Sequence, residues 1–105
     1  MQKIFAIENL PQAAIEASAY VIANHLDAIR TQLNDAETSA LAIALPTAPY
    51  DHRDWRRALA RDLARAHAPK RVNVVAAADE AAAEKLLSYL RDALGVTGQY
   101  LEAHG

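Results

Sequence analysis

The densest group of ionisable side chains in this 105-residue chain is the run Tyr50, Asp51 and His52. Acid–base catalysis needs groups of this kind. The run lies where a helix is predicted to begin, however, and an aspartate at a helix N-terminus more often caps the helix than it catalyses. No serine occupies a nucleophile elbow, and no pair of carboxylates is marked out. The run therefore predicts the start of a helix, and the pattern alone does not indicate a reaction.

Metal and thiol chemistry find little support in the composition. Cysteine is absent, which excludes disulfides, thiolate nucleophiles and cysteine-ligated metals and is typical of a protein of the reducing cytoplasm. The histidines lack the four-residue spacing that would place two ligands on one helix face, so no metal site is predicted. His25 lies beside an apolar stripe, where a structural role is expected. The four histidines are His25, His52, His67 and His104.

Hydrophobic periodicity predicts one α/β domain over residues 1–105, built on a parallel sheet. Nearly unbroken apolar runs indicate strands covered on both faces of a mostly parallel sheet. The predicted order is β-α-β-α-β-α-β, with strands at Lys3–Ile7, Ala40–Leu45, Arg71–Ala76 and Gly98–Leu101 and helices at Pro11–Asn34, His52–His67 and Asp79–Leu94. The predicted buried stripe of the first helix is Ile15, Ala19, Ile22, Leu26, Ile29 and Leu33, and that of the second is Trp55, Leu59, Leu63 and Ala66.

Two features at helix ends are predicted from single residues. Asp79 is expected to be the N-cap of the third helix, and Gly95 is expected to take a left-handed conformation just after it. No stretch approaches the roughly 20 apolar residues of a membrane span, and Glu8 and Pro11 interrupt the N-terminal apolar run. We expect a soluble, cytoplasmic protein, and the abundance of alanine and arginine is typical of a bacterial source.

Charge is unevenly distributed along the chain. The net charge is −2, but residues 51–71 contain seven basic and three acidic side chains. Four arginines recur at every fourth residue, so they share one side of the second helix. The stripe is either a surface for an acidic partner or an ordinary solvated helix face. Nucleic acid binding is not expected, because no aromatic residues alternate with the arginines to stack on bases. The stripe consists of Arg53, Arg57, Arg61 and Arg65.

Two segments of the C-terminal half carry a family resemblance. The helix ALARDLARAHAP runs into the strand RVNVVAA, and the last strand opens with VTGQYL. In this order, with one helix between them, the two segments resemble the C-terminal half of the short-chain dehydrogenase/reductases. The tail 102–105 is similar to the closing motif of that family. The resemblance implies a truncated Rossmann-type domain. Its most specific residues are Leu63-Ala64, Ala68-Pro69, Arg71-Val72-Asn73-Val74-Val75 and Val96-Thr97-Gly98-Gln99.

The resemblance also indicates what the chain lacks for redox chemistry. Members of that family bind a nicotinamide dinucleotide on a glycine-rich turn after the first strand. The three glycines here, Gly95, Gly98 and Gly105, all lie in the last eleven residues. No phosphate-binding turn of that kind is available, so no cofactor is predicted. The segment that covers the substrate in the family is also missing, because Ala76, Ala77 and Ala78 lead almost directly into the third helix.

The catalytic residues of the family are displaced in this chain. Its tyrosine and lysine, four residues apart, fall on Pro49 and Arg53 in the family's spacing. A shift of one position makes Tyr50 and Arg53 the remaining catalytic candidates, although Asp54 lies four residues after Tyr50 and its charge would raise the pKa of a phenol. Packing is the alternative role for Tyr50. Thr47 is the only substitute for the catalytic serine between the second strand and the second helix.

Two surfaces are expected from the same resemblance. Without the nucleotide-binding half, Lys3–Ile7 would form an open sheet edge that another element should cover. The first and second helices correspond to those that form a four-helix dimer contact in the family. A homodimer, or docking on a full-length short-chain dehydrogenase, is therefore expected. The interface candidates are Tyr20, Arg57, Ala60, Arg61 and Ala64, although an alanine in a helix is also simply a good helix former.

Two functions from different classes follow. The first is a non-catalytic module derived from the reductases that acts by oligomerisation or protein interaction. The second is a small-ligand binder or residual oxidoreductase that uses the crevice at the carboxyl ends of the strands, where open α/β sheets bind ligands. The residues expected at that crevice are Asn9, Thr47, Tyr50 and Ala77.

Overall fold

The computed structural model describes residues 1–103, so the part of the predicted tail motif at His104 and Gly105 lies outside the described residues. Strands and helices alternate along the chain. The elements are β1 (Gln2–Ala6), α1 (Ala14–Asn34), β2 (Ala40–Leu45), the short 3-10 helix η1 (Tyr50–His52), α2 (Arg53–Ala66), β3 (Arg71–Ala77), α3 (Glu80–Asp92) and β4 (Tyr100–Ala103).

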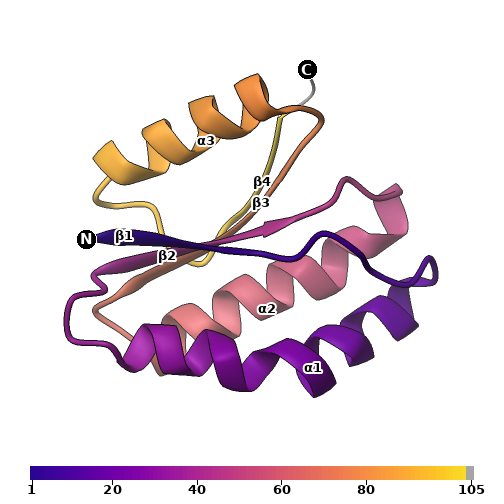
Figure 1. Ribbon diagram of the computed structural model, residues 1–105, viewed down its shortest axis with the longest axis horizontal. Helices are drawn as coiled ribbons and strands as arrows, with labels where there is room; N and C mark the ends of the chain where they lie inside the picture. Colours follow the sequence, from indigo (N-terminus) through magenta and orange to yellow (C-terminus); the bar gives the residue numbers. More distant parts are fainter. Residues whose placement is uncertain (104–105) are drawn as a thin grey trace.

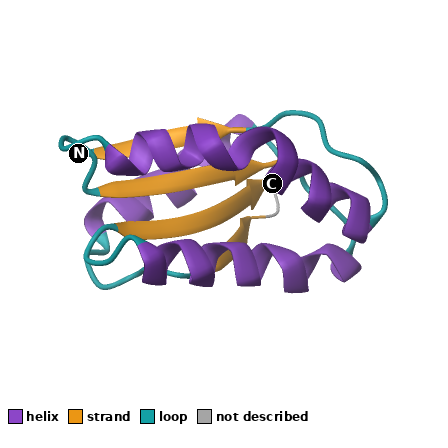
Figure 2. Cartoon of the chain, turned by 90° about the horizontal axis from the view of Figure 1, so that it is seen from below, coloured by secondary structure: helices purple, strands orange, loops and turns teal. Residues whose placement is uncertain are grey.

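The strands form one parallel sheet in the order β1-β2-β3-β4 (Figure 2). Helices α1 and α2 lie side by side against one face, and α3 lies alone against the other (Figure 1). Four parallel strands and three helices in strict alternation confirm the predicted fold class. Because each β-α-β unit returns the chain to the same end of the sheet, the carboxyl ends of all four strands lie at one end of the sheet, together with the loops that follow them.

The core is divided unequally between the two faces of the sheet. The face toward α1 and α2 holds the larger cluster, in which Val21, Ile29 and Leu33 of α1 pack with Leu41 and Ile43 of β2. The face toward α3 holds a small cluster of three fully buried residues, Ala42, Val75 and Leu90, with partly buried leucines around it. Most of the apolar burial that stabilises the domain therefore involves α1 and α2.

The orientation of α1 differs from the predicted one. The residues that face the sheet are Ala17, Val21, Ile29 and Leu33, whereas Ile15 is 81% exposed and Ile22 is 50% exposed. The prediction was wrong in this respect because α1 carries apolar residues around more than half of its circumference. Periodicity could not decide which of those residues face the sheet. The helix also begins at Ala14 rather than at Pro11.

Of the two predictions for the ends of α3, one is confirmed and one is wrong. The predicted N-cap is confirmed, since the Asp79 carboxylate accepts a hydrogen bond of 2.8 Å from the Ala82 N–H. The left-handed glycine is Gly98, with a φ of 71°, and not Gly95. Gly98 passes close to α2, and a Cβ placed on it would lie 3.5 Å from the Ala64 Cβ. Strand β4 consequently begins at Tyr100, two residues later than predicted.

The two family-like segments are bonded directly to each other. The buried Asn73 side chain in β3 donates to the Val96 carbonyl at 3.0 Å and accepts from the Gln99 N–H at 3.0 Å. The Val72 N–H donates to Thr97 Oγ1 at 3.0 Å. Val72, Asn73 and the segment 96–99 therefore form one structural unit that holds the α3–β4 connection against the sheet. Their role in this chain is to build the scaffold.

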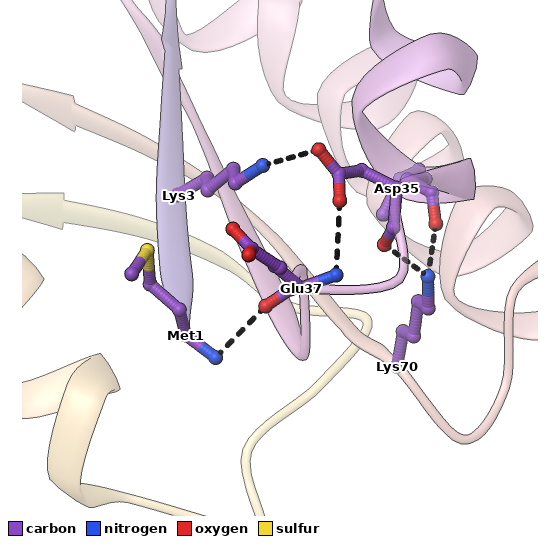
Figure 3. Close-up of polar contacts among 6 residues, drawn as sticks. Met1, Lys3, Asp35, Glu37 and Lys70 are labelled. Atoms are coloured by element: carbon purple, nitrogen blue, oxygen red, sulfur yellow. Dashed lines mark hydrogen bonds and ion pairs between the residues drawn. The ribbon is translucent and has the colours of Figure 1, made fainter.

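A set of polar contacts closes the amino ends of the strands (Figure 3). The Lys3 ammonium lies 2.9 Å from the Asp35 carboxylate, which also accepts from the Glu37 N–H at 2.9 Å. These two hydrogen bonds, from Lys3 first, hold the pKa of Asp35 below its usual range. Lys70 donates to the Leu33 and Asp35 carbonyls, so it caps the carboxyl end of α1. The loop after α2 contains a cis peptide bond at Ala68-Pro69.

Candidate functional site

A crevice of about 500 Å³ opens at the carboxyl ends of β1 and β2. Its walls come from the segment after β1 and from the segment that joins β2 to η1. Of the four residues predicted for this site, Asn9 and Thr47 line the crevice. Ala77 lines a separate, shallower pocket between the sheet and α3, and the Tyr50 side chain is 77% exposed outside both. The structure thus brings two of the four residues together.

The buried side chain of Arg56, which is only 1% exposed, lines this crevice. Its Nη1 donates to the Pro46 carbonyl at 2.8 Å and to Tyr100 Oη at 3.1 Å. The guanidinium carbon lies 5.2 Å from the ring centroid of Trp55 and 5.6 Å from that of Tyr100. Aromatic rings that lie beside a guanidinium stabilise the cation without neutralising its charge.

The Arg56 charge has no acidic partner within the described part of the chain. The ion pairs of residues 1–103 involve Lys3, Arg53 and Arg91, and none includes Arg56. In addition, the Arg56 Nε–H is buried and has no hydrogen-bond acceptor. A buried guanidinium normally satisfies its donors with a carboxylate or with several carbonyls. Arg56 is therefore an incompletely satisfied buried cation.

Sequence analysis missed Arg56, although a signal for its burial was present. The residues three, four and seven positions later are Leu59, Ala60 and Leu63, and all three are buried. This spacing places Arg56 on the sheet-facing side of α2. Arg56 is one of the seven basic residues of the segment 51–71, but it lies outside the arginine stripe of α2.

A second buried polar side chain, His52, forms part of the crevice wall. His52 is 3% exposed, and its Nε2 lies 2.8 Å from the Gln12 carbonyl. The Trp55 Nε1–H donates to His52 Nδ1 at 3.1 Å. Because an indole N–H only donates and a carbonyl only accepts, His52 must carry its proton on Nε2. These bonds tie the start of α2 to the segment before α1, which is a positioning role.

The remaining catalytic candidates, Tyr50 and Arg53, are not arranged as an acid–base pair. The Arg53 guanidinium stacks over the face of the Tyr50 ring, 4.8 Å from its centroid. One of its Nη atoms is paired with Glu102 of β4 at 2.6 Å. A cation that assists a phenol must lie beside the hydroxyl. This geometry instead links the beginning of α2 to β4.

The outer side of α1 and α2 forms an apolar surface. Ile15 and Ile22 are exposed one above the other, seven residues apart, and Ile22 also lines a groove of about 440 Å³ between the two helices. Trp55 lines the same groove, and its sides carry the oppositely charged Arg30 and Asp62. We refer to Ile15, Ile22 and this groove as the helix surface. Exposed apolar patches of this kind mark interaction sites more often than scattered single residues do.

The predicted interface residues divide into two groups. Tyr20 is 40% exposed, and Arg57 and Arg61 are also exposed, so these three are available to a partner. Ala60 is 0% exposed and packs in the sheet-facing core, and Ala64 is half-buried beside Gly98. Ala60 is therefore not accessible to a partner, and the close approach that these two alanines permit within the chain is to the sheet and to Gly98.

A second apolar surface lies at β1. As expected, β1 is an edge strand, and its Ile4 side chain is 49% exposed on the side of α3. Met1 is also exposed there. Lys3 lies on the same strand and forms its ion pair with Asp35 on the opposite face. Lysines on edge strands discourage pairing with other strands, so this edge is partly protected.

These features define a class: a parallel α/β domain of Rossmann-like arrangement with a crevice at the carboxyl ends of its strands. A sequence profile described as SDR-like, Short chain dehydrogenase-like protein, matches residues 5–103. The chain belongs to this SDR-like family, which confirms the resemblance drawn from its motifs. No curated protein and no solved structure matches it. Within residues 1–103, no helix has both the length and the apolar character to cross a membrane.

Proposed function

We propose that this chain is a non-catalytic, short-chain dehydrogenase-derived module that acts by forming a homodimer through the helix surface. The observation that carries the proposal is the exposure of Ile15 and Ile22 on α1, next to the groove that α1 forms with α2. Two large β-branched side chains exposed on one helix face favour burial against another apolar surface. A second copy of the same surface offers that burial.

Charge favours a second copy as the occupant. The groove carries Arg30 on α1 and Asp62 on α2, and neither forms an ion pair within residues 1–103. A two-fold axis that passes midway between the acid and the base sets the base of each copy against the acid of the other. With the axis in that position, the helix surface is complementary to itself in both apolar area and charge.

The non-catalytic part of the proposal is supported by the arrangement of the former catalytic positions. Arg53 is engaged with the Tyr50 ring and with Glu102, so it is not free to assist a proton transfer. The segment that follows β1, residues 7–13, contains no glycine, and phosphate binding on a tight turn requires several. We expect nicotinamide nucleotides to leave the melting temperature of the protein unchanged.

The experiment compares matched substitutions on the two exposed apolar surfaces. Ile22, on the helix surface, is 50% exposed, and Ile4, on the β1 edge strand, is 49% exposed. Ile22→Glu and Ile4→Glu therefore introduce the same charge at equally exposed positions. Sedimentation equilibrium of the wild-type chain should give twice the 11.4 kDa monomer mass. Ile22→Glu should give the monomer mass, and Ile4→Glu should remain dimeric.

Each other outcome rejects a specific part of the proposal. A wild-type monomer at high protein concentration would reject the homodimer. Dissociation by Ile4→Glu but not by Ile22→Glu would move the interface to the sheet edge. Association only with a full-length short-chain dehydrogenase, lost in Ile22→Glu, would replace the second copy by a larger relative. A rise in melting temperature with NADH or NADPH would reject the non-catalytic part.

A further inference from the structure

We propose that the crevice at the carboxyl ends of β1 and β2 binds a small monocarboxylate through the guanidinium of Arg56. This inference goes beyond the proposed function and does not depend on dimer formation. It rests on a buried cation that lines the crevice and lacks an acidic partner within residues 1–103, and on an unsatisfied donor of the same side chain.

The geometry of the guanidinium selects the chemical class of the ligand. Nη1 is already occupied by the Pro46 carbonyl and Tyr100 Oη. The Nε–H has no acceptor, and Nη2 makes no hydrogen bond among the described residues. Nε and Nη2 form one edge of the planar guanidinium, with two parallel N–H bonds. This edge matches the two oxygens of a carboxylate, which accept side by side. Because the Nε atom is closed to solvent in this structure, the side chains that line the crevice must move for both oxygens to reach this edge.

The charge of the crevice favours one negative charge over two. Among the described residues, Arg56 is the only arginine or lysine that lines it, and both ring nitrogens of His52 are already bonded to Gln12 and Trp55. The exposed Glu8 lies on its wall. A monocarboxylate neutralises the guanidinium, whereas a second negative charge would have no cation to pair with and would be repelled by Glu8. Dicarboxylates and phosphate should therefore bind more weakly than a monocarboxylate of similar size.

The rest of the lining fits a ligand with a short, mainly apolar body. Leu10, Pro46 and Ala48 provide apolar walls, and the exposed Asn9 and Thr47 provide polar groups. Ligand sites of this size combine an apolar lining with a few convergent polar groups. The crevice is formed by segments that follow the carboxyl ends of strands, which is the usual position for ligands in a parallel α/β sheet.

The first test observes Arg56 directly in the wild-type protein. A two-dimensional 15N NMR spectrum of arginine side chains resolves a buried Nε–H, and Arg57→Lys and Arg56→Lys assign the signal by its disappearance. Titration with butyrate and benzoate should shift the Arg56 Nε–H signal downfield as a charge-assisted hydrogen bond forms. The uncharged butyramide and benzamide should leave it in place. An Arg56 signal that does not move with the carboxylates would overturn the proposal.

The second test measures affinity by calorimetry with matched arginine variants. Arg56→Met should weaken benzoate binding by about 10- to 100-fold, as expected for loss of a charge-assisted bidentate contact. Arg57→Met, at the neighbouring exposed arginine, should bind as the wild type does. Circular dichroism checks that both variants are folded. Should Arg56→Met not fold, Thr47→Trp provides the second variant, because a large side chain at the wall should fill the crevice and abolish binding.

The remaining outcomes also decide the question. Equal affinity for benzoate and benzamide would show an apolar pocket and overturn the role of charge. Tighter binding of inorganic phosphate or succinate than of butyrate would overturn the monocarboxylate assignment. Unchanged benzoate binding in a folded Arg56→Met protein would overturn the site. A monomeric wild-type protein that still binds benzoate through Arg56 would reject the dimer and retain this inference.

Discussion

The charged side chains at the two ends of the sheet differ in the partners that they bond. At the amino ends of the strands, Lys3 pairs with Asp35, and Lys70 caps α1 through two backbone carbonyls (Figure 3). At the carboxyl ends, Arg56 is buried and forms no ion pair among residues 1–103, and Arg53 contacts both the Tyr50 ring and Glu102. The amino end pairs its charged side chains, and its unpartnered buried atoms, Gln32 Oε1 and Thr38 Oγ1, are neutral. The carboxyl end retains an unsatisfied donor on a buried cation.

This difference separates scaffold from site. The family-like residues Val72 and Asn73 bond to the segment 96–99, which lies before β4, so the motifs that define the family build the amino end. Arg56 belongs to none of the motifs that carry the family resemblance. The amino end should therefore govern stability, while changes at the carboxyl end should affect ligand binding more than folding.

The largest expected effect is at Asn73. Asn73→Ala leaves the Val96 carbonyl and the Gln99 N–H without their partner, and each unsatisfied group costs about 1–3 kcal/mol when buried. We expect the free energy of unfolding in urea to fall by about 2–3 kcal/mol. The matched control is Asn24→Ala, since the exposed Asn24 bonds only to a carbonyl of its own helix. A loss at Asn73 no greater than at Asn24 would contradict the scaffold role of the amino end.

The next effect is at Gly98, which also belongs to the scaffold. The Cβ introduced by Gly98→Ala would lie 3.5 Å from the Ala64 Cβ, which is ordinary contact. The alanine would, however, have to adopt a φ of 71°. Left-handed backbone costs a residue with a side chain about 1–2 kcal/mol. The expected loss of unfolding free energy is therefore about 1 kcal/mol. Gly95→Ala, where no atom lies within 4 Å and φ is not positive, should be neutral or slightly stabilising. Equal effects at both glycines would exclude the conformational explanation.

The regular elements and their order were predictable because apolar runs and helical periodicity are local properties of the sequence. Strand β2 agrees with its prediction at both ends, and β3 differs by one residue. Strand β4 was misplaced because the backbone of residues 98 and 99 is bonded to Val72 and Asn73, a contact between distant segments that no local pattern records. The orientation of α1 was missed for a similar reason, since only packing decides which apolar stripe meets the sheet.

The candidate site was less predictable than the fold. The rule that ligands bind at the carboxyl ends of parallel strands located the crevice and two of its residues, Asn9 and Thr47. It could not identify Arg56, because a charged residue is expected on the exposed side of a helix. The positions of Leu59 and Leu63 relative to Arg56 indicated that Arg56 is buried, but only the structure shows that its guanidinium forms no ion pair in the part of the chain described.

A smaller effect is expected at Tyr100, on the carboxyl side. Burial raises the pKa of Tyr100, and its hydrogen bond from Arg56 only partly offsets this. The folded protein therefore keeps the phenolic proton to a higher pH than the unfolded chain, which loses it near pH 10. Stability is complete below about pH 10 and falls as the pH rises through the folded pKa. Tyr100→Phe should reduce this alkaline loss.

At neutral pH, Tyr100→Phe should cost less than about 1 kcal/mol, because Arg56 keeps its bond to the Pro46 carbonyl. The control for loss of a hydroxyl is Tyr89→Phe, at an exposed tyrosine of α3. Urea unfolding at about pH 8 and about pH 11 measures both quantities. A cost at Tyr100 as large as that at Asn73 would contradict the division between a stabilising amino end and a permissive carboxyl end.

The smallest effect should come from the ion pair at the amino end. The hydrogen bond from Lys3, with that from the Glu37 N–H, lowers the pKa of Asp35, so the folded protein holds the carboxylate charged to a lower pH than the unfolded chain does. The contribution is complete above the unfolded pKa of about 3.9 and is lost as the pH falls through the folded value. Asp35→Asn and Lys3→Met should each flatten the stability profile between about pH 5 and about pH 2, with Asp27→Asn as the exposed control.

Because the pair of Lys3 and Asp35 is at the surface, the difference in unfolding free energy between wild type and variant should shrink when salt is raised to about 1 M. A profile that keeps its acid slope in Asp35→Asn would show that other carboxylates, and not this contact at the amino end, set the acid stability.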